Sequence, residues 1–265
     1  KSSFIFSKFK DKWKERAEDW KPAIYQNVND PIRSQYSYLS DGVMQVGEIV
    51  PAQPDLFPGQ IKLKDVNGFS RDGAGNPIVD ENGRFIATGE PDGKIDEADI
   101  VLLGSSDPDF IAGFSNTISY KNFELNFHFN GMFGRQIVDQ TDLALGVSAD
   151  GVWQNGRNAL RSIYDRLTPN NPTNTRPASH YGYTQYSSGD FFMQDAWFIR
   201  LQNLSLAYKL PNLWIGKIIK SAAIRFDAQN LFIITPYDGV DPETDAYVAA
   251  YPNVKTYTIG LDIKF

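Results

Sequence analysis

The side chains best suited to hold a metal ion lie in an acidic part of the first half of the chain. They are Asp65, Asn67, Asp92, Asp96 and Asp99. Carboxylate and amide oxygens are the ligands that Ca²⁺ prefers. If the intervening segment, residues 69–91, forms a protruding hairpin, the two halves of the set can meet. The other interpretation is a loop in which these side chains accept hydrogen bonds from backbone N–H groups, as in Asx turns.

Groups for catalysis are scarce in this chain. It contains no cysteine, which excludes zinc–thiolate, iron–sulfur and cysteine-nucleophile chemistry within it. The two histidines are separated, with His128 in an expected strand and His180 in an expected long loop. No serine nucleophile elbow, phosphate loop or zinc motif is found. We therefore expect a protein that is not an enzyme.

Composition limits the class of protein further. The net charge is −6, and the acidic balance argues against a general nucleic-acid binder, which needs basic surface to neutralise phosphates. No apolar run approaches the ~20 residues of a membrane helix, whereas barrel strands show only alternation. Aromatic residues make up 14% of the chain, which suits a sugar-binding surface or the girdles of a barrel. The start at Lys1, without Met or a signal-like segment, predicts a piece of a longer or processed protein.

The end of the chain carries the clearest strand pattern. Its apolar positions alternate with polar ones and are Tyr257, Ile259, Leu261, Ile263 and Phe265. A two-residue period places the two sets on opposite faces of a strand. The same pattern predicts strands over 110–120, 123–133, 196–209 and 222–234, with a bulge near Gln202 and Asn203. A tight turn is expected at Lys121 and Asn122, with Asn122 tolerating the left-handed conformation.

The polar positions of these strands form a second set. They are Glu124, Asn126, His128, Asn130, Arg225, Asp227 and Gln229. A soluble sheet would bury the opposite, apolar face against a core. A membrane barrel would turn that face toward lipid and the polar set toward a wet lumen.

The connections alternate in length. The turn at 121–122 is tight and the one at 211–221 is moderate, whereas 134–192 and 235–253 are long loops. This asymmetry is typical of outer-membrane barrels and places the C-terminus on the short-turn, periplasmic side.

Three further local structures are expected outside the strands. Residues 50–109 form another long loop, with a hairpin at 78–86 that turns at Asn82 and Gly83. Lys8–Trp20 is expected to be a short amphipathic helix lying on a surface, with a basic membrane-surface helix as the alternative. A second helix is expected over Asn155–Leu167.

A series of segments in fixed order carries a resemblance to a known family. The segments are PIRSQYSYLSDGV (31–43), PGQIKLKDVNG (58–68), DGKIDEAD (92–99), GSSDPDFIAGF (104–114), SYKNFEL (119–125), LTPNNP (167–172), IRLQNLSLAY (199–208), NLF (230–232), YDGVDPE (237–243) and 251–265. Over residues 31–265 the chain resembles the C-terminal part of TonB-dependent outer-membrane transporters of the SusC/RagA type. Residues 1–30 match nothing and form a charged, possibly helical lead-in.

The resemblance implies a large barrel with a plug inside it. It also implies a SusD-like surface lipoprotein as a lid, and TonB-driven uptake of oligosaccharides or sometimes peptides. The chain has no plug or TonB-contacting segment, and its few strands cannot close a barrel that holds a plug. The remaining wall must therefore come from an N-terminal barrel and plug segment, because open strand edges are not viable in hydrocarbon.

The resemblance also bears on the acidic residues. The family often shows an uninterrupted Asp-x-Asn-Gly-Asp-Gly-Lys-Ile-Asp-x-x-Asp run that resembles an EF-hand loop. Here the run is split by residues 69–91. We expect that the loop could hold a structural Ca²⁺, and that the protein requires no cofactor.

Six tyrosines lie in the long, extracellular loops. They are Tyr181, Tyr183, Tyr186, Tyr237, Tyr247 and Tyr251. Their faces could stack on sugars, or they could pack the loops together or form an aromatic girdle. The final strand, with its apolar row from Tyr257 to Phe265, resembles the signal by which barrels are recognised for insertion.

The expected fold is all-β, as an antiparallel transmembrane β-barrel fragment that supplies the C-terminal strands of a large, plugged barrel with long extracellular loops. The expected function is a part of an outer-membrane importer of oligosaccharides or peptides. Its expected partners are the missing barrel and plug, a SusD-like lipoprotein, the TonB complex and outer-membrane lipid, but no nucleic acid. Two alternatives stay open: a soluble, secreted carbohydrate-binding β-domain with structural calcium, and an adhesin or structural barrel without transport.

Overall fold

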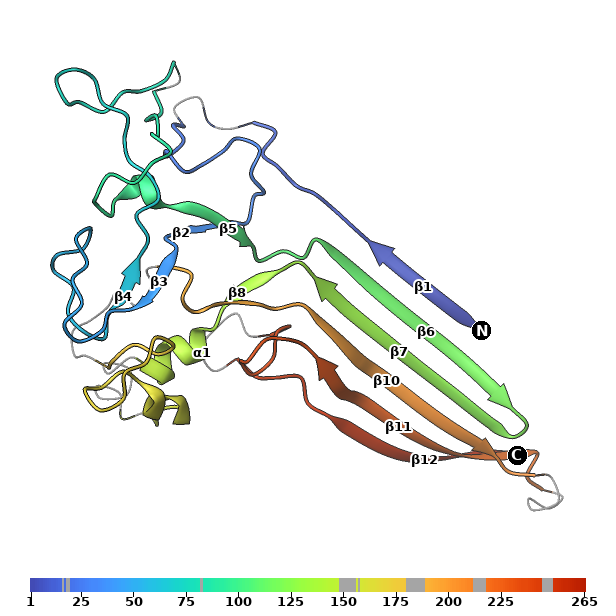
Figure 1. The fold of residues 1–265 in the computed structure, drawn as a ribbon. Coiled ribbons are helices and arrows are strands. Elements are labelled where there is room, and N and C mark those ends of the chain that lie inside the picture. Colours follow the sequence, from blue (N-terminus) through green and yellow to red (C-terminus); the bar gives the residue numbers. More distant parts are fainter. Residues whose placement is uncertain are drawn as a thin grey trace.

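A six-stranded antiparallel sheet dominates the computed structural model, which describes residues 1–15, 17, 20–81, 83–147, 156, 158–179, 189–211, 218–244 and 250–265. The strand order is β1-β6-β7-β10-β11-β12 (Figure 1). The strands are β1 (Ser2–Ser7), β6 (Phe110–Tyr120), β7 (Phe123–Phe133), β10 (Phe198–Lys209), β11 (Ser221–Ile234) and β12 (Thr256–Lys264). The predicted strands are therefore confirmed, two of them residue for residue.

The β6–β7 hairpin shows how local sequence sets the register. Tyr120 pairs with Phe123, so only Lys121 and Asn122 form the turn, as predicted. Lys121, rather than Asn122, has the positive φ of 52° that the turn requires. The assignment of the left-handed conformation to Asn122 was therefore wrong. The geometry of the two-residue turn decides which residue has a positive φ, and it overrides the side-chain preference of asparagine for that conformation.

The predicted bulge in β10 is present. The register shifts between Leu201 and Asn203 against both β7 and β11. On β11, Asn230 has a positive φ of 52° and its side-chain amide donates to the carbonyl of Val254 at 3.0 Å. The bulge restores the alternation, so that residues on both sides of it keep to their own face.

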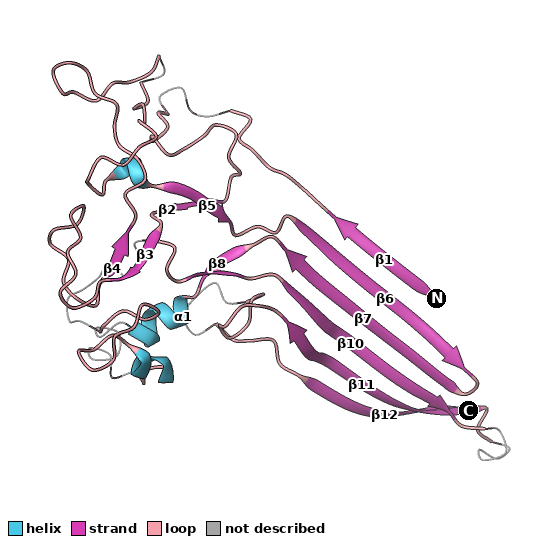
Figure 2. Cartoon of the chain, viewed as in Figure 1, coloured by secondary structure: helices cyan, strands magenta, loops and turns pink. Residues whose placement is uncertain are grey.

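The sheet is a single layer. In the described parts of the chain, the extensive contacts of these strands are all with their neighbours in the sheet. Figure 2 shows the strands projecting away from the helices and loops. Phe123 is 50% exposed and Ile259 is 81% exposed, so the apolar rows are not covered by a second layer of this chain.

The rest of the described chain gathers at one end of the sheet, here called the loop end. It contains three two-stranded sheets and short helical turns. The strands are β2 (Ser34–Ser37) with β5 (Val101–Ser105), β3 (Ser40–Val43) with β4 (Ile61–Leu63), and β8 (Gln136–Val138) with β9 (Met193–Asp195). The helical turns are α1 (Gln140–Asp142), a π-helical turn (Leu143–Val147) and two 3₁₀ turns (Glu97–Asp99 and Arg161–Asp165). The C-terminus lies at the opposite end, the same end of the sheet as the β6–β7 turn (Figure 1).

Within the described residues, clusters of buried apolar side chains occur only at the loop end. One consists of Ile61, Val147 and Phe192, and the other of Ile137, Ala196 and Tyr237. Each is small, so the loop end is held by several local contacts rather than by one core.

Two helix predictions require correction. Within Lys8–Trp20 the described residues form no helix, because the chain there leaves the sheet at Ser7 and runs toward the loop end (Figure 1). The lead-in instead contains strand β1, which pairs with β6 and places Phe4 beside Phe114. The helix expected over Asn155–Leu167 is only the 3₁₀ turn Arg161–Asp165 in its described part.

The segment between the two halves of the acidic set does protrude as predicted. Isolated bridges join Phe69 to Ala87 and Val79 to Phe85, and Gly83 has a positive φ of 76° at the turn. Asn82 lies outside the described residues. In the part of the chain that is described, no helix is long and apolar enough to cross a membrane.

Candidate functional site

The predicted polar set lies on one face of the sheet, here called the polar face. In the register, His128 stands between Ser115 and Asn203, and Asn126 stands between Thr117 and Ser205. Cross-strand hydrogen bonds join these positions. Ser115 Oγ lies 2.8 Å from His128 Nδ1, and Thr117 donates to Asn126 at 2.6 Å.

The polar face continues onto the last two strands. Asp227 pairs with Ser205 on one side and Thr258 on the other. Arg225 forms an ion pair of 2.8 Å with Asp262, which is on the same face. The polar positions of β6, β7, β10, β11 and β12 therefore form one continuous hydrophilic surface.

The opposite face, here called the apolar face, is exposed to its surroundings. Its exposed members include Phe4, Phe6, Phe114, Ile118, Tyr120, Phe123, Leu206, Ile224, Phe226, Tyr257, Ile259, Leu261 and Ile263. Rings meet across the strands, as Phe123 does with Tyr208 at 4.7 Å between centroids. The surface is interrupted where Asn116 of β6 meets Ser2 of β1. An apolar surface that extends over six strands is still far larger than a soluble monomer normally exposes, and it marks contact with another protein or with lipid.

The acidic set is brought together in the structure, but through backbone hydrogen bonds. Asp99 is fully buried, and its carboxylate accepts from the N–H groups of Val66 at 2.8 Å and Asp96 at 2.9 Å. Asp65 accepts from the N–H groups of Asp92 at 3.1 Å and Gly93 at 2.6 Å. The two halves flanking residues 69–91 therefore meet, as the hairpin interpretation requires.

These oxygens are turned toward N–H donors rather than toward a common centre. Asn67 accepts from Gly89 N–H at 2.7 Å, and Asp96 accepts from Ala98 N–H at 2.8 Å to cap the 3₁₀ turn. Within the described residues, no three His, Cys, Asp or Glu side chains are grouped so that they could hold a metal ion. These contacts match the interpretation as Asx-type capping. Calcium binding by this loop stays a prediction.

The charge of this loop also affects a neighbouring phenol. Burial raises the pKa of Tyr38 above its ordinary value, and the nearby carboxylates Asp99, Asp96 and Glu97 add to the effect. Because a negative potential disfavours the phenolate, Tyr38 stays protonated beside the loop.

The loop tyrosines divide into three groups. Tyr181, Tyr183, Tyr186 and Tyr247 lie outside the described residues, as does His180. Tyr251 is 81% exposed and is available for stacking. Tyr237 is only 5% exposed and packs with Ile137 and Ala196, which favours the interpretation that it packs the loops together over the one in which it faces a substrate. Its hydrophobic ring gains more from this cluster than from contact with water.

A buried ion pair at the loop end was missed by the sequence reasoning. Arg200 of β10 donates to Asp241 at 2.7 Å, and both side chains are 5% exposed. Glu243 Oε2 lies 3.3 Å from Arg200 Nε, an ion-pair contact outside hydrogen-bond geometry. Arg200 pairs with Asn130 across the strands and so belongs to the polar face. The available signal was an arginine at a polar-face position of β10, with two carboxylates in the following long loop.

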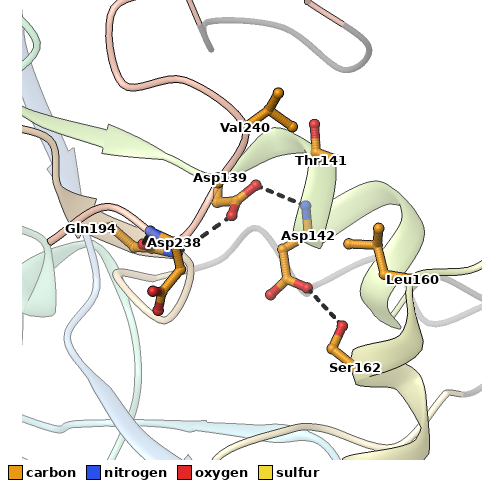
Figure 3. Close-up of a pocket in the computed structure, with 9 residues that line it drawn as sticks. Asp139, Thr141, Asp142, Leu160, Ser162, Gln194, Asp238 and Val240 are labelled. Atoms are coloured by element: carbon orange, nitrogen blue, oxygen red, sulfur yellow. Dashed lines mark hydrogen bonds between the residues drawn. The ribbon is translucent and has the colours of Figure 1, made fainter. Parts of the chain in front are cut away.

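A cavity of about 300 Å³ lies between the helical turns and the loop after β11. Figure 3 shows three carboxylates around it, from Asp139, Asp142 and Asp238. Asp139 accepts from the N–H of Asp142 at 2.8 Å, and Ser162 donates to Asp142 at 3.3 Å. Arg176 holds Asp142 through two contacts, at 2.9 and 3.0 Å, which neutralises that carboxylate.

Arg135, also near the loop end, forms no ion pair with the described carboxylates. Burial lowers the pKa of Arg135 below its usual range, while the carboxylates of Asp107 and Glu243 act in the opposite direction. Desolvation without a close counter-charge disfavours the charged guanidinium, although arginine remains protonated in proteins.

Comparison with known proteins identifies the type of protein. No protein-family model matches the chain. It is 31% identical over 201 residues to TonB-dependent receptor P3 of Formosa agariphila, an alignment that covers 70% of this chain and 19% of that receptor. It is 31% identical over 243 residues to receptor P26 of the same organism, covering 83% of this chain and 23% of that receptor. With TonB-dependent receptor SusC of Bacteroides thetaiotaomicron the identity is 29% over 197 residues, covering 71% and 18%.

The solved structures agree in fold. The structure of the RagAB peptide transporter superposes with a TM-score of 0.58 and 24% identity, over 88% of this chain and 23% of that one. The RagAB peptide importer in the open-open state gives a TM-score of 0.65 and 20% identity, over 100% of this chain and 26% of that one. This chain is of the SusC/RagA type of TonB-dependent receptor.

The chain spans about a fifth of the length of the relatives that it matches. Its six-stranded sheet is thus a segment of the wall of a SusC/RagA-type outer-membrane β-barrel, and the open edges of β1 and β12 are where the segment ends. The relatives are receptors and transporters rather than enzymes, which fits the absence of catalytic motifs in the sequence.

Proposed function

We propose that this chain forms part of the wall of a TonB-dependent outer-membrane importer of oligosaccharides or peptides. The observation that carries the proposal is the one-layer sheet with an exposed apolar face and a continuous polar face. In a barrel the apolar face meets lipid, and the polar face meets a water-filled interior and the plug. Transport as the activity is supported by the relatives, which include a TonB-dependent receptor and a peptide transporter.

The orientation follows from the loops. The long connections after β7 and β11 emerge at the loop end, while the β6–β7 turn and the C-terminus are at the other (Figure 1). Barrels of this kind have short periplasmic turns and long extracellular loops. The C-terminus is therefore periplasmic in this proposal, and the loop end meets a SusD-like lipoprotein and the cargo. The plug and the contact with the TonB complex belong to the remainder of the receptor.

The exposed apolar face argues against the alternative of a soluble, secreted domain. A secreted carbohydrate-binding domain would need to cover the apolar face, and the described chain supplies no second layer. An exposed surface of that size would aggregate in water.

The assignment of the two faces is tested by paired arginine substitutions in the full-length receptor. Leu206 lies on the apolar face and is 41% exposed, and Ser205 is its neighbour on the polar face. An arginine facing lipid costs ~2–4 kcal/mol at the bilayer midplane and less toward the interfaces, whereas one facing the lumen costs little. We expect Leu206→Arg to lower the heat-modifiable receptor in outer-membrane fractions at least severalfold, and Ser205→Arg to leave it near the parent amount.

Leu206→Met, which keeps an apolar side chain of similar size, serves as the matched control. Equal assembled amounts for the two arginine variants would contradict the assignment.

The cargo class is tested on intact cells with two fluorescent probes, a mixture of dextrin oligosaccharides and a mixture of tryptic oligopeptides. Receptor-dependent uptake of neither probe would count against import as the function.

A further inference from the structure

The segment Tyr237–Thr244, here called the strap, follows β11 and lies along the start of β10. Thr235, just before it, donates to the carbonyl of Trp197 at 2.8 Å. The N–H of Asp238 donates to Gln194 Oε1 at 2.9 Å, and the ring of Tyr237 packs against Ala196. The strap therefore contacts successive positions from Gln194 onward rather than projecting away from the wall.

The last of these contacts turns the strap over the polar face. Arg200 is a polar-face residue, and its guanidinium binds Asp241 at 2.7 Å while lying 3.3 Å from Glu243. For both carboxylates to reach that guanidinium, residues 241–243 must lie over the polar face. Arg200 also lies over the ring of Phe198, with its Cζ 5.5 Å from the ring centroid.

Asp241 organises the strap as well as binding the wall. Its carboxylate accepts from the N–H of Glu243 at 3.0 Å and from the N–H of Asn253 at 3.0 Å. Asn253 in turn donates to Glu243 at 3.1 Å. One carboxylate thus joins the two described ends of the β11–β12 loop and fastens both to the wall through Arg200.

We propose that Arg200 is a positioning residue that pins the strap across the inner face of the barrel mouth, and that loss of the Arg200–Asp241 pair releases the strap. This inference rests on the proposed function, which makes the polar face the lining of the passage. Residues 238–240 of the strap form one side of the cavity shown in Figure 3. Pinning and release of the strap therefore change the shape of the passage at its loop end.

The physical basis is the burial of a pair with few other supports. A buried arginine and carboxylate are both stable only while they face each other, because either one alone is a charge without a partner. The strap's described contacts with β9 and the start of β10 include the hydrogen bond from Asp238 to Gln194 and the packing of the Tyr237 ring, neither of which involves a buried charge. The pair is therefore the contact whose loss has the largest effect on the position of the strap.

The test uses the absence of cysteine from this chain. Ala196 is fully buried beneath Tyr237, so Ala196→Cys places a thiol that is covered while the strap is pinned. The full-length receptor, with any cysteine elsewhere replaced, is labelled on intact cells with a membrane-impermeant polyethylene-glycol maleimide. The rate of labelling is read as a gel shift, and the assembled amount is measured in parallel.

We expect Arg200→Met to increase the rate of labelling at Cys-substituted position 196 by about tenfold or more, because the open position of the strap becomes that much more populated. Arg225→Met is the matched control. It removes an arginine from the same face, but one whose pair with Asp262 is about half exposed on both sides. The control variant should label at the parent rate.

A second variant separates release of the strap from loss of folding. Arg200→Met combined with Asp241→Asn leaves no buried charge without a partner, so it should restore the assembled amount while the strap stays unpinned and labelling stays fast. Labelling within about twofold of the parent rate in both variants overturns the inference. Loss of assembly in both variants also overturns it, because the pair is then part of the folded framework. The Leu206→Arg and Ser205→Arg comparison reports on the proposed function independently of these outcomes.

Discussion

The wall and the loop end of this molecule are stabilised in different ways. The wall is a regular sheet in which each strand contacts its neighbours and leaves one face apolar and exposed. The loop end has small apolar clusters, a bidentate contact between Arg176 and Asp142, and the buried pair of Arg200 and Asp241. The wall is held by strand pairing, with its apolar face open to its surroundings, whereas the loop end is held by small clusters and ion pairs.

The difference has a consequence for how substitutions act. In the wall, the effect of a side chain depends on which face it occupies and on how closely the neighbouring strand approaches. In the loop end, it depends on individual buried partners. Stability from strand pairing can therefore be distinguished from stability due to individual buried partners. The comparison uses substitutions of the same type, placed in the two regions or at covered and open positions of one region.

The largest effect is expected at Tyr237. Replacing it by alanine empties the cluster with Ile137 and Ala196, and loss of a buried aromatic side chain costs about 3–5 kcal/mol. The amide of Ala196, which donates to the carbonyl of Arg135 at 3.0 Å, should lose protection in hydrogen exchange followed by mass spectrometry.

Tyr251→Ala is the matched control for this change. Tyr251 is 81% exposed, so its removal should alter local stability by less than about 0.5 kcal/mol. Similar loss of amide protection in the two variants would show that the loop end lacks the internal cluster on which the comparison depends.

A smaller effect is expected within the wall at Gly131. A Cβ there would lie 2.7 Å from the carbonyl oxygen of Phe198 and 2.9 Å from the ring of Phe133, so Gly131→Val forces the strands apart. Overpacking of this kind costs about 1–3 kcal/mol. The temperature at which detergent-solubilised receptor loses its heat-resistant mobility should fall.

Gly260→Val provides the comparison in the same sheet. No atom lies within 4 Å of the position that its Cβ would occupy, so this variant should keep the parent temperature. If both glycine variants behave alike, close strand approach is not what limits substitution in the wall.

The smallest effect is expected from deletion of Phe265. This residue ends the apolar row of the terminal strand and is 73% exposed. Burying an aromatic side chain in hydrocarbon contributes ~1.5–3 kcal/mol, and only part of that is realised at a strand end. The assembled amount in the outer membrane should fall about twofold or more, with Phe265→Tyr near the parent level. An unchanged amount after the deletion would refute the role of this strand as an assembly signal.

The regular part of the fold could be predicted because its signal repeats. Alternation over β6, β7 and β12 fixes both the strand and its faces, and the slip at Gln202 shows where the register shifts. The short strand β1 was missed because Phe4 and Phe6 form too short a pattern in a charged neighbourhood. Its assignment depends on pairing with residues 111–116, which are far away in sequence.

The candidate site was predicted less completely because its geometry depends on distant contacts. The polar set could be read from parity, but Arg200 becomes distinctive only when Asp241 folds back onto it. Tyr237 and Tyr251 look alike in sequence, and only the packing around Ala196 separates them. The acidic residues were found, yet the direction of their oxygens depends on which backbone N–H groups the protruding segment brings near.

Strand β1 is joined to β6 by a long connection, residues 8–109, that crosses to the rim and returns. The protruding segment 69–91 hangs from that connection, well away from every strand of the wall (Figure 1). Insertions of this kind lengthen the outer rim without changing any pairing in the cylinder beneath it. The length and sequence of this segment can therefore change while every strand pairing of the sheet is kept.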